Sequence, residues 1–251
     1  MDSGFKVWLP TLNVIEPPWV ARMDSDDWAF PDRFKFQMEY LEQHPHTTVL
    51  GTHAIFLEDQ KPLHSHLPLS PGQVAAAMPF YCCVCHPSTI LNRKQIIEEK
   101  LYPDFNHAED YGLWLNLILN PQRRIVNLPN VLLKYRRGIS RPQYNEQQIL
   151  STIKIKKIFD QNIGMTGTRP AFIENYDWDY VEHWFSDYHQ KIIKRLPYID
   201  KNLLMKLIVN QKRKAAKGGF HKFGKPVFPL RRQYPKQRRE PQHRSDVEAF
   251  L

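Results

Sequence analysis

Apolar residues recur along this chain in two periods, one typical of strands and one typical of helices. Short runs rich in β-forming residues predict strands over residues 19–23, 47–57, 88–91, 125–127 and 131–135. Recurrence every three or four residues predicts helices over residues 30–43, 74–78, 94–100, 107–119, 144–159, 176–196 and 203–209. Strands and helices mix in the first part and only helices follow, which predicts an α/β core with a helical C-terminal extension.

The pattern stops after Gln211, and the charge balance changes at the same place. Residues 1–210 hold 23 Lys+Arg and 23 Asp+Glu, whereas residues 211–251 hold 12 against 3 and so carry the whole net charge of +9. A segment this basic and this poor in aliphatic residues predicts a disordered tail. We therefore expect three parts: a core over 1–142, a helical extension over 143–210 and a basic tail over 211–251.

The basic tail has three interpretations. A solvated charged tail is the default. Contact of residues 211–244 with anionic lipid at the inner face of the membrane is the second. Nucleic-acid binding is the third, but the tail lacks regularly interleaved aromatic residues, and the balanced charge of residues 1–210 argues against it.

The three cysteines all lie in the short segment Cys82-Cys83-Val84-Cys85. Neighbouring cysteines are poor disulfide partners, and an odd, clustered set does not make a secreted disulfide framework. Zinc is also disfavoured, because no second cysteine pair exists to complete a tetrahedral site. We expect three reduced, buried thiols on a strand and a cytoplasmic location.

Acidic residues follow the predicted strand over residues 19–23, in the run Asp24-Ser25-Asp26-Asp27. Strand periodicity would place Asp24 and Asp26 on the same side, where two carboxylates repel unless a cation or a proton lies between them. Hard oxygen ligands suit Mg²⁺ or Mn²⁺, which a substrate phosphate can also bind. The alternative is that these acids form a turn and that Asp27 caps the helix that follows.

The context of these acids resembles a known family. The run from Ala21 to Asp27, followed by Pro31-Asp32-Arg33 and Gln37, closely resembles the metal-binding segment of family 2 glycosyltransferases. The resemblance implies that Asp24 and Asp26 form the DxD pair of these enzymes. It also implies that Asp26 makes the main metal contact and that Asp24 contacts the sugar or ribose side of the donor.

A second motif follows further along the chain, in His107-Ala108-Glu109-Asp110-Tyr111. It resembles the Glu-Asp segment of the same family, where the aspartate is the general base. The resemblance implies that Asp110 removes the proton of an attacking sugar hydroxyl and that Glu109 helps to position the acceptor. The alternative is that both acids only favour the positive N-terminus of a helix.

A third motif, from Asn127 to Arg136, resembles the closing segment of the family, a strand that ends in Tyr-Arg. The resemblance implies that Arg136 helps to hold the diphosphate; a solvated arginine after a strand is the alternative. His86, in Cys85-His86-Pro87-Ser88, is a candidate contact to the acceptor, although a lone histidine before proline is more often structural. Trp114 lies on an apolar helical face, which predicts a core residue.

Together the three motifs imply a partial GT-A, Rossmann-like core that matches the family over about residues 19 to 148. They imply an inverting, metal-dependent transfer from a nucleotide-diphosphate sugar to a glycan or lipid-linked acceptor, with Mn²⁺ or Mg²⁺ as the cofactor. These enzymes carry a nucleotide-binding half before the DxD segment, whereas only about two dozen residues precede Asp24 here. We therefore expect an N-terminally truncated enzyme: either a second polypeptide supplies the missing half, or the chain is a truncated product of a split gene. The alternative is a catalytically inactive fragment or partner subunit.

Overall fold

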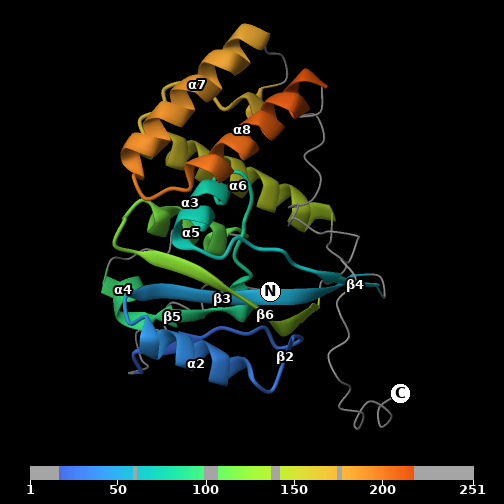
Figure 1. Ribbon diagram of the computed structural model, residues 1–251. Helices are drawn as coiled ribbons and strands as arrows, with labels where there is room; N and C mark the ends of the chain where they lie inside the picture. The colour runs from blue at the N-terminus through green and yellow to red at the C-terminus, as the bar shows by residue number, and fades with distance from the viewer. Residues whose placement is uncertain (1–16, 59–60, 99–106, 137–141, 174–176, 218–251) are drawn as a thin grey trace, which may run out of the picture.

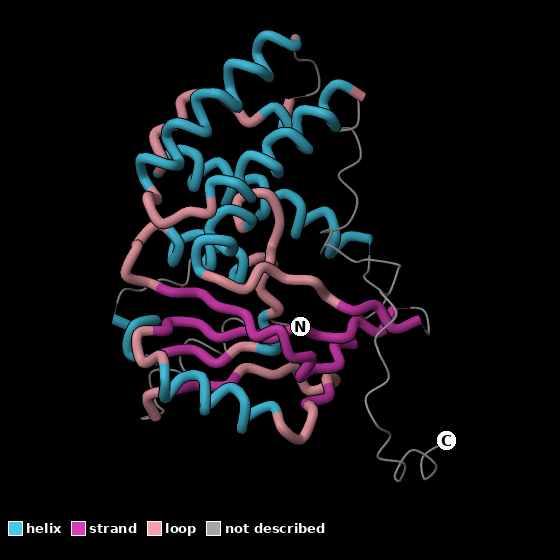
Figure 2. The backbone as a smooth tube through the Cα atoms, viewed as in Figure 1, coloured by secondary structure: helices cyan, strands magenta, loops and turns pink. Residues whose placement is uncertain are grey.

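The computed structural model describes residues 17–58, 61–98, 107–136, 142–173 and 177–217. In Figure 1 a sheet lies across the middle of the molecule, with helices on both of its faces. Figure 2 shows the strands as one magenta layer and the C-terminal helices as a separate cyan group beyond one face. The mixed α/β class and the helical C-terminal extension are therefore confirmed.

The sheet has the strand order β1-β5-β3-β6-β2, and β4 pairs with β3 outside this path. Its strands are β1 (Trp19–Ala21), β2 (Trp28–Ala29), β3 (Thr47–Glu58), β4 (Lys61–His64), β5 (Ile90–Asn92) and β6 (Arg124–Arg136). Among the described strands, β3 and β6 pair in parallel, and the other pairings are antiparallel. The long strands β3 and β6 therefore form the centre of the sheet, with β1 and β2 at its edges.

The helices divide between the two faces of the sheet. They are α2 (Arg33–Gln43), α3 (Pro71–Ala77), α4 (Arg93–Glu98), α5 (Glu109–Ile118), α6 (Pro142–Asn162), α7 (Trp178–Arg195) and α8 (Lys201–Ala216), with 3-10 turns η1 (His86–Ser88) and η2 (Pro170–Phe172). Helix α2 covers one face, while α3 and α5 lie on the other face between the sheet and the C-terminal helices (Figure 1). Helix α5 is buried around most of its circumference, as expected for a helix between two layers.

Strand alternation explains how one sheet supplies two cores. Successive side chains of a strand point to opposite faces. On β3, Val49 joins the core under the C-terminal helices and Leu50 joins the core under α2. On β5, Leu91 and Ile90 divide in the same way. The larger core continues without a break into α7 and α8, so the extension packs on the same hydrophobic core as the sheet. The boundary at residue 142 stays a prediction.

One expectation about the sheet is wrong: residues 125–127 and 131–135 are not two separate strands, because β6 runs through Pro129 between them. The β3 neighbours Thr52 and His53 pair with Leu128 and Val131, so the pairing passes over two residues of β6. Proline has no N–H to donate to a strand ladder and is accepted where the ladder is irregular. The register shift therefore explains how the strand continues.

The expected start of the basic tail is also wrong. Helix α8 continues to Ala216, so the first residues of the predicted tail are helical. Ala215 is buried against the main core, and Lys212 forms an ion pair with Glu182 of α7. These tertiary contacts stabilise the end of helix α8, although the composition of this segment alone predicts disorder. The remainder of the predicted tail, residues 218–251, lies outside the described residues.

Within the part of the chain that the structure describes, no helix combines the length and the apolar character needed to cross a membrane.

Candidate active site

The acidic run forms a turn between the two edge strands and does not continue β1. Strand β1 ends at Ala21, and the backbone N–H of Asp27 donates to the carbonyl of Asp24 at 3.2 Å. The strand-periodicity argument for Asp24 and Asp26 is therefore wrong, since neither residue is in a strand. Asp26 is exposed and Asp24 is half-buried, with its Oδ1 ion-paired to Arg22 at 2.6 Å.

Two buried polar side chains fix the backbone just before this turn. Arg33 and Gln37 on α2 are both fully buried, and Nε of Arg33 donates to Oε1 of Gln37 at 3.1 Å. Arg33 also donates to the carbonyl of Arg22 at 2.8 Å. Gln37 donates to the carbonyls of Leu50 and Ser88, both at 3.0 Å. Helix α2 therefore connects the acidic turn to β3 and to η1, and buried polar groups with such partners are costly to remove.

Asp27 does not cap α2, contrary to the alternative interpretation of the acidic run. Its Oδ1 accepts a hydrogen bond from the backbone N–H of Arg136 at 2.9 Å, which joins the turn to the end of β6. Its Oδ2 is buried and has no hydrogen-bond partner. Burial, together with the negative charges of Asp24 and Asp26, raises the pKa of Asp27 to about 6. The turn therefore carries more negative charge than its surroundings neutralise.

These residues fit a hard divalent cation better than they fit zinc. They offer carboxylate oxygens, which Mg²⁺ and Mn²⁺ prefer. Across the described ranges, no three or more His, Cys, Asp or Glu side chains are grouped as a metal site. A cation here would need oxygen atoms from another molecule to complete its coordination, as magnesium sites that bind a phosphate do.

The second acidic pair lies at the N-terminus of α5. Glu109 and Asp110 are both in the first turn of the helix, where the helix dipole favours negative charge. The backbone N–H of Tyr111 donates to Oδ1 of Asp110 at 2.7 Å. Burial and then the charge of Glu109 raise the pKa of Asp110 to about 6. A carboxyl group with this pKa is ready to accept a proton near neutral pH.

The two acidic segments share the same electrostatic neighbours. Besides the effect of burial, the guanidinium of Arg22 lowers the pKa of both Asp27 and Asp110. Burial raises the pKa of Tyr135 on β6, and the charges of Asp27 and Asp110 raise it further. Because such effects fade with distance, both carboxylates lie within electrostatic reach of both Arg22 and Tyr135. The fold therefore brings together two acidic segments that are far apart in the sequence.

The other residues singled out from the sequence, Arg136, His86 and Trp114, differ in exposure and in their contacts. The Arg136 side chain is exposed, while its backbone N–H binds Asp27. The His86 ring is edge-on to Trp114, with centroids 5.7 Å apart. Burial, and then Arg22, lowers the pKa of His86 to about 3, so the imidazole is neutral at physiological pH. Trp114 is completely buried, which confirms it as a core residue.

The cysteine segment is not a strand, contrary to expectation. Cys82, Cys83 and Cys85 are free thiols in the loop between α3 and η1. Cys83 and Cys85 are buried, as predicted, and Cys82 is half-buried. Burial raises the pKa of Cys85 to about 12, so this thiol is protonated and is a poor nucleophile or metal ligand.

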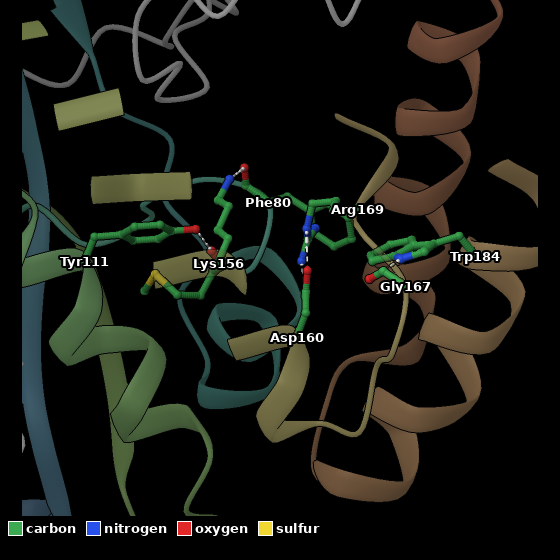
Figure 3. A network of polar contacts seen from close by, with 8 residues as sticks. Phe80, Tyr111, Lys156, Asp160, Gly167, Arg169 and Trp184 are labelled. Carbon is green, nitrogen blue, oxygen red and sulfur yellow. Dashed lines mark hydrogen bonds and ion pairs between the residues drawn. The ribbon is translucent and has the colours of Figure 1, made fainter. Parts of the chain in front are cut away.

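A polar network joins the start of α5 to the C-terminal helices (Figure 3). The Tyr111 hydroxyl donates to the carbonyl of Met78 at 2.7 Å. Lys156 on α6 donates to the carbonyl of Phe80 at 3.0 Å, and its ammonium lies 5.6 Å from the centroid of the Tyr111 ring. Burial lowers the pKa of Lys156 to about 7. The residue next to Asp110 is therefore held in part by the helical extension.

A buried ion pair completes this network. Arg169 donates from Nε and Nη2 to the two carboxylate oxygens of Asp160, at 3.0 and 2.5 Å. Its guanidinium lies 5.2 Å from the ring centroids of both Trp184 and Tyr188 on α7. A bidentate pair enclosed by aromatic rings fixes α6 and α7 in one arrangement.

Sequence reasoning assigned no role to Arg22 and considered Asp27 only as a helix cap, yet both residues connect the site. A signal was present for Arg22, since a cation close to an acidic run is a natural partner for it. Lys156 and Asp160 are four residues apart on one helix and so adjoin, but nothing in the sequence indicated that Arg169 meets them.

Curated relatives of this chain are glycosyltransferases. No protein-family model matches the chain. It is 35% identical over 120 residues to the amylovoran biosynthesis glycosyltransferase AmsE of Erwinia amylovora, covering 47% of this chain and 45% of AmsE. It is 30% identical over 119 residues to the O-antigen biosynthesis glycosyltransferase WbnJ of Escherichia coli, covering 47% of this chain and 46% of WbnJ. The chain thus spans about half the length of these relatives.

Among solved structures, the chain is similar to residues 1–349 of S. aureus TarS. The TM-score is 0.45 at 16% identity, over 87% of this chain and 68% of that one. The complex of TarS with UDP gives a TM-score of 0.44 at 15% identity, over 86% of this chain and 67% of that one. TM-scores this low do not establish that the chain and TarS share a fold. The sequence similarity therefore relates about half of this chain to glycosyltransferases of amylovoran and O-antigen biosynthesis.

Proposed function

We propose that this chain is the metal- and acceptor-binding part of a family 2 glycosyltransferase with a partial GT-A core. It would transfer a sugar from a nucleotide-diphosphate sugar to a glycan or lipid-linked acceptor in polysaccharide or O-antigen biosynthesis. One observation carries the proposal: Asp27 of the acidic turn and Asp110 of α5 both lie within electrostatic reach of Arg22 and Tyr135. The similarity to AmsE and WbnJ supports the same class of reaction.

In this proposal Asp110 is the general base. A sugar hydroxyl is a weak nucleophile, and removal of its proton as it attacks the anomeric carbon lowers the barrier. The new bond forms on the face opposite the departing diphosphate, so the configuration inverts. The raised pKa of Asp110 suits this step, since a base with a pKa near the working pH is the most effective. Glu109 would orient the acceptor, and neutral His86 would contact it.

On the donor side, Asp26 and Asp24 would hold Mn²⁺ or Mg²⁺. When bound, the cation would offset the negative charge that develops on the diphosphate leaving group. Asp26 is exposed and hence accessible, whereas Asp24 would exchange its ion pair with Arg22 for the cation or the sugar. Arg136, at the end of β6, would add a positive charge near the diphosphate.

The alternative is a catalytically inactive fragment or partner subunit. One observation bears on it: β1 pairs with β5 alone among the described strands. An unpaired strand edge can accept another strand. We propose that a second polypeptide, or sequence beyond the described residues, supplies the nucleotide-binding half at this edge.

Binding of Mn²⁺ in the presence of a panel of nucleoside diphosphates, measured by calorimetry, tests the donor side. We expect a metal-dependent nucleotide complex that Asp26→Ala weakens by about tenfold or more, because a carboxylate ligand is lost. Ser25→Ala, in the same exposed turn, is the matched control and should bind as the parent does. Equal Mn²⁺ affinity of Asp26→Ala and the parent would remove the donor-side assignment.

A further inference from the structure

Helix α8 is the most basic of the described helices. The helix KNLLMKLIVNQKRKAA holds five Lys or Arg residues and no Asp or Glu. Its buried residues, Leu204, Ile208 and Ala215, all face the main core. Helix α8 lies on the outside of the C-terminal group of helices (Figure 1), so its opposite side is free to meet another surface.

This outward side combines apolar and basic residues in one row. Met205, Val209, Arg213 and Lys217 follow one another at a spacing of four and are all exposed, and residues so spaced adjoin on a helix. Met205 and Val209 are 43% and 38% exposed, so apolar surface lies beside these cations. Lys206 is also exposed and lies on the same side. The outward face therefore presents both apolar and basic side chains to solvent, in addition to the apolar face that the helix buries.

Three acids of the segment from α7 to α8 are already engaged in contacts of their own. Glu182 of α7 pairs with Lys212, which is half-buried between the two helices. Asp200 accepts the backbone N–H of Leu203 and caps the start of α8. Asp187 of α7 pairs with Lys191 of the same helix. The positive charge of the outward row is thus left for another partner.

We propose that this outward face of α8 docks on an anionic lipid membrane. Lys and Arg near such a surface are attracted by the lipid headgroups, and apolar side chains beside them enter the boundary between headgroups and acyl chains. Residues 218–251, which follow α8 directly, add eight more Lys or Arg residues against three acids. The chain beyond α8 therefore has the charge to extend the same contact.

A nucleic acid would fit this face less well. Single-stranded nucleic acid is commonly bound by aromatic side chains on which bases stack, next to a basic groove. Helix α8 has no Phe, Tyr or Trp, and Met205 and Val209 offer no flat surface for stacking. The mixture of aliphatic and basic residues instead matches a lipid boundary. This inference does not depend on the proposed sugar transfer.

Sedimentation of the full chain with vesicles tests the proposal. We expect binding to phosphatidylcholine mixed with phosphatidylglycerol and none to phosphatidylcholine alone. The double variant Lys206→Glu/Arg213→Glu should bind the anionic vesicles at least about tenfold more weakly, because each basic residue near the membrane adds to the attraction. Lys35→Glu/Lys157→Glu changes the charge equally at exposed positions of α2 and α6 and should bind as the parent does.

A second variant separates the apolar contribution from charge. Met205→Ser/Val209→Ser keeps every cation, so we expect it to bind anionic vesicles more weakly and to be released at lower salt than the parent. Circular dichroism shows whether each variant keeps its helices. Unchanged vesicle binding by the charge-reversed α8 variant would overturn the proposal, as would an equal loss in the α2/α6 control. Tighter binding to a single-stranded oligonucleotide than to vesicles, lost in the α8 variant, would overturn it in favour of nucleic acid.

Discussion

Asp110→Asn is expected to lower kcat for sugar transfer by about two to four orders of magnitude, the usual range for loss of a general base. Asparagine keeps the size of the side chain but cannot accept the proton of the acceptor hydroxyl. The measurement is the initial rate with Mn²⁺, a nucleotide-sugar donor and an acceptor, at saturating donor. KM for the donor should change little, because Asp110 is assigned to the acceptor side.

If Asp110 is the general base, the pH dependence of the transfer rate should follow the titration of its carboxyl group. The pKa of Asp110 is raised to about 6 in the free protein, so the base is protonated below this pH and kcat/KM should rise as the pH passes through about 6. Glu109→Gln is the matched control. It removes a charge that raises the pKa of Asp110, so the rising limb should move to lower pH, and the loss of kcat should be smaller than in Asp110→Asn. Full activity of Asp110→Asn would contradict the assignment of the base.

Asp160→Ala is expected to lower the free energy of unfolding by about 3–5 kcal/mol, the cost of leaving one charge of a buried ion pair uncompensated. Arg169 would lose both hydrogen bonds to Asp160 while still enclosed by the rings of Trp184 and Tyr188. For a chain of this length, this corresponds to a fall in Tm on the order of 10 °C. Denaturant unfolding followed by circular dichroism measures the change.

Asp187→Ala is the control for this prediction. Asp187 also pairs with a cation, Lys191, but the pair is partly exposed on one helix, with both side chains at 31% relative exposure. Exposed pairs at this spacing contribute about 0.3–0.5 kcal/mol. Similar losses in Asp160→Ala and Asp187→Ala would show that the ion pair in the network of Figure 3 does not hold the extension to the core.

Hydrophobic periodicity predicted most of the regular elements because burial decides them. The apolar spacing of Tyr111, Leu115 and Ile118 predicted a helix over 107–119, and α5 spans Glu109–Ile118. The strand expected over 47–57 is β3, Thr47–Glu58. The errors arose where tertiary contacts override local composition. A register shift admits Pro129 into β6, and the packing of Ala215 extends α8 into the basic segment.

The candidate site was predictable as residue types and motifs, but its contacts were not. The two acidic segments could be recognised from their sequence context. The turn at Asp24–Asp27 contradicts the strand geometry, and the hydrogen bond from the Arg136 backbone to Asp27 depends on how β6 meets β2. The pairing of Asp160 with Arg169 likewise depends on how the chain returns from α6 to α7. Such contacts follow from three-dimensional packing, and local periodicity carries no signal for them.

The central claim is that the acidic turn and the start of α5 converge on shared groups. Carboxyl titration by NMR in Arg22→Gln tests it most directly. Arg22 lowers the pKa of both Asp27 and Asp110, so its neutral replacement should raise both pKa values above about 6. Both carboxyl groups shifting upward together is the predicted result. A shift of Asp27 alone, with Asp110 unchanged, would show that the two segments do not share this cation and would contradict the account.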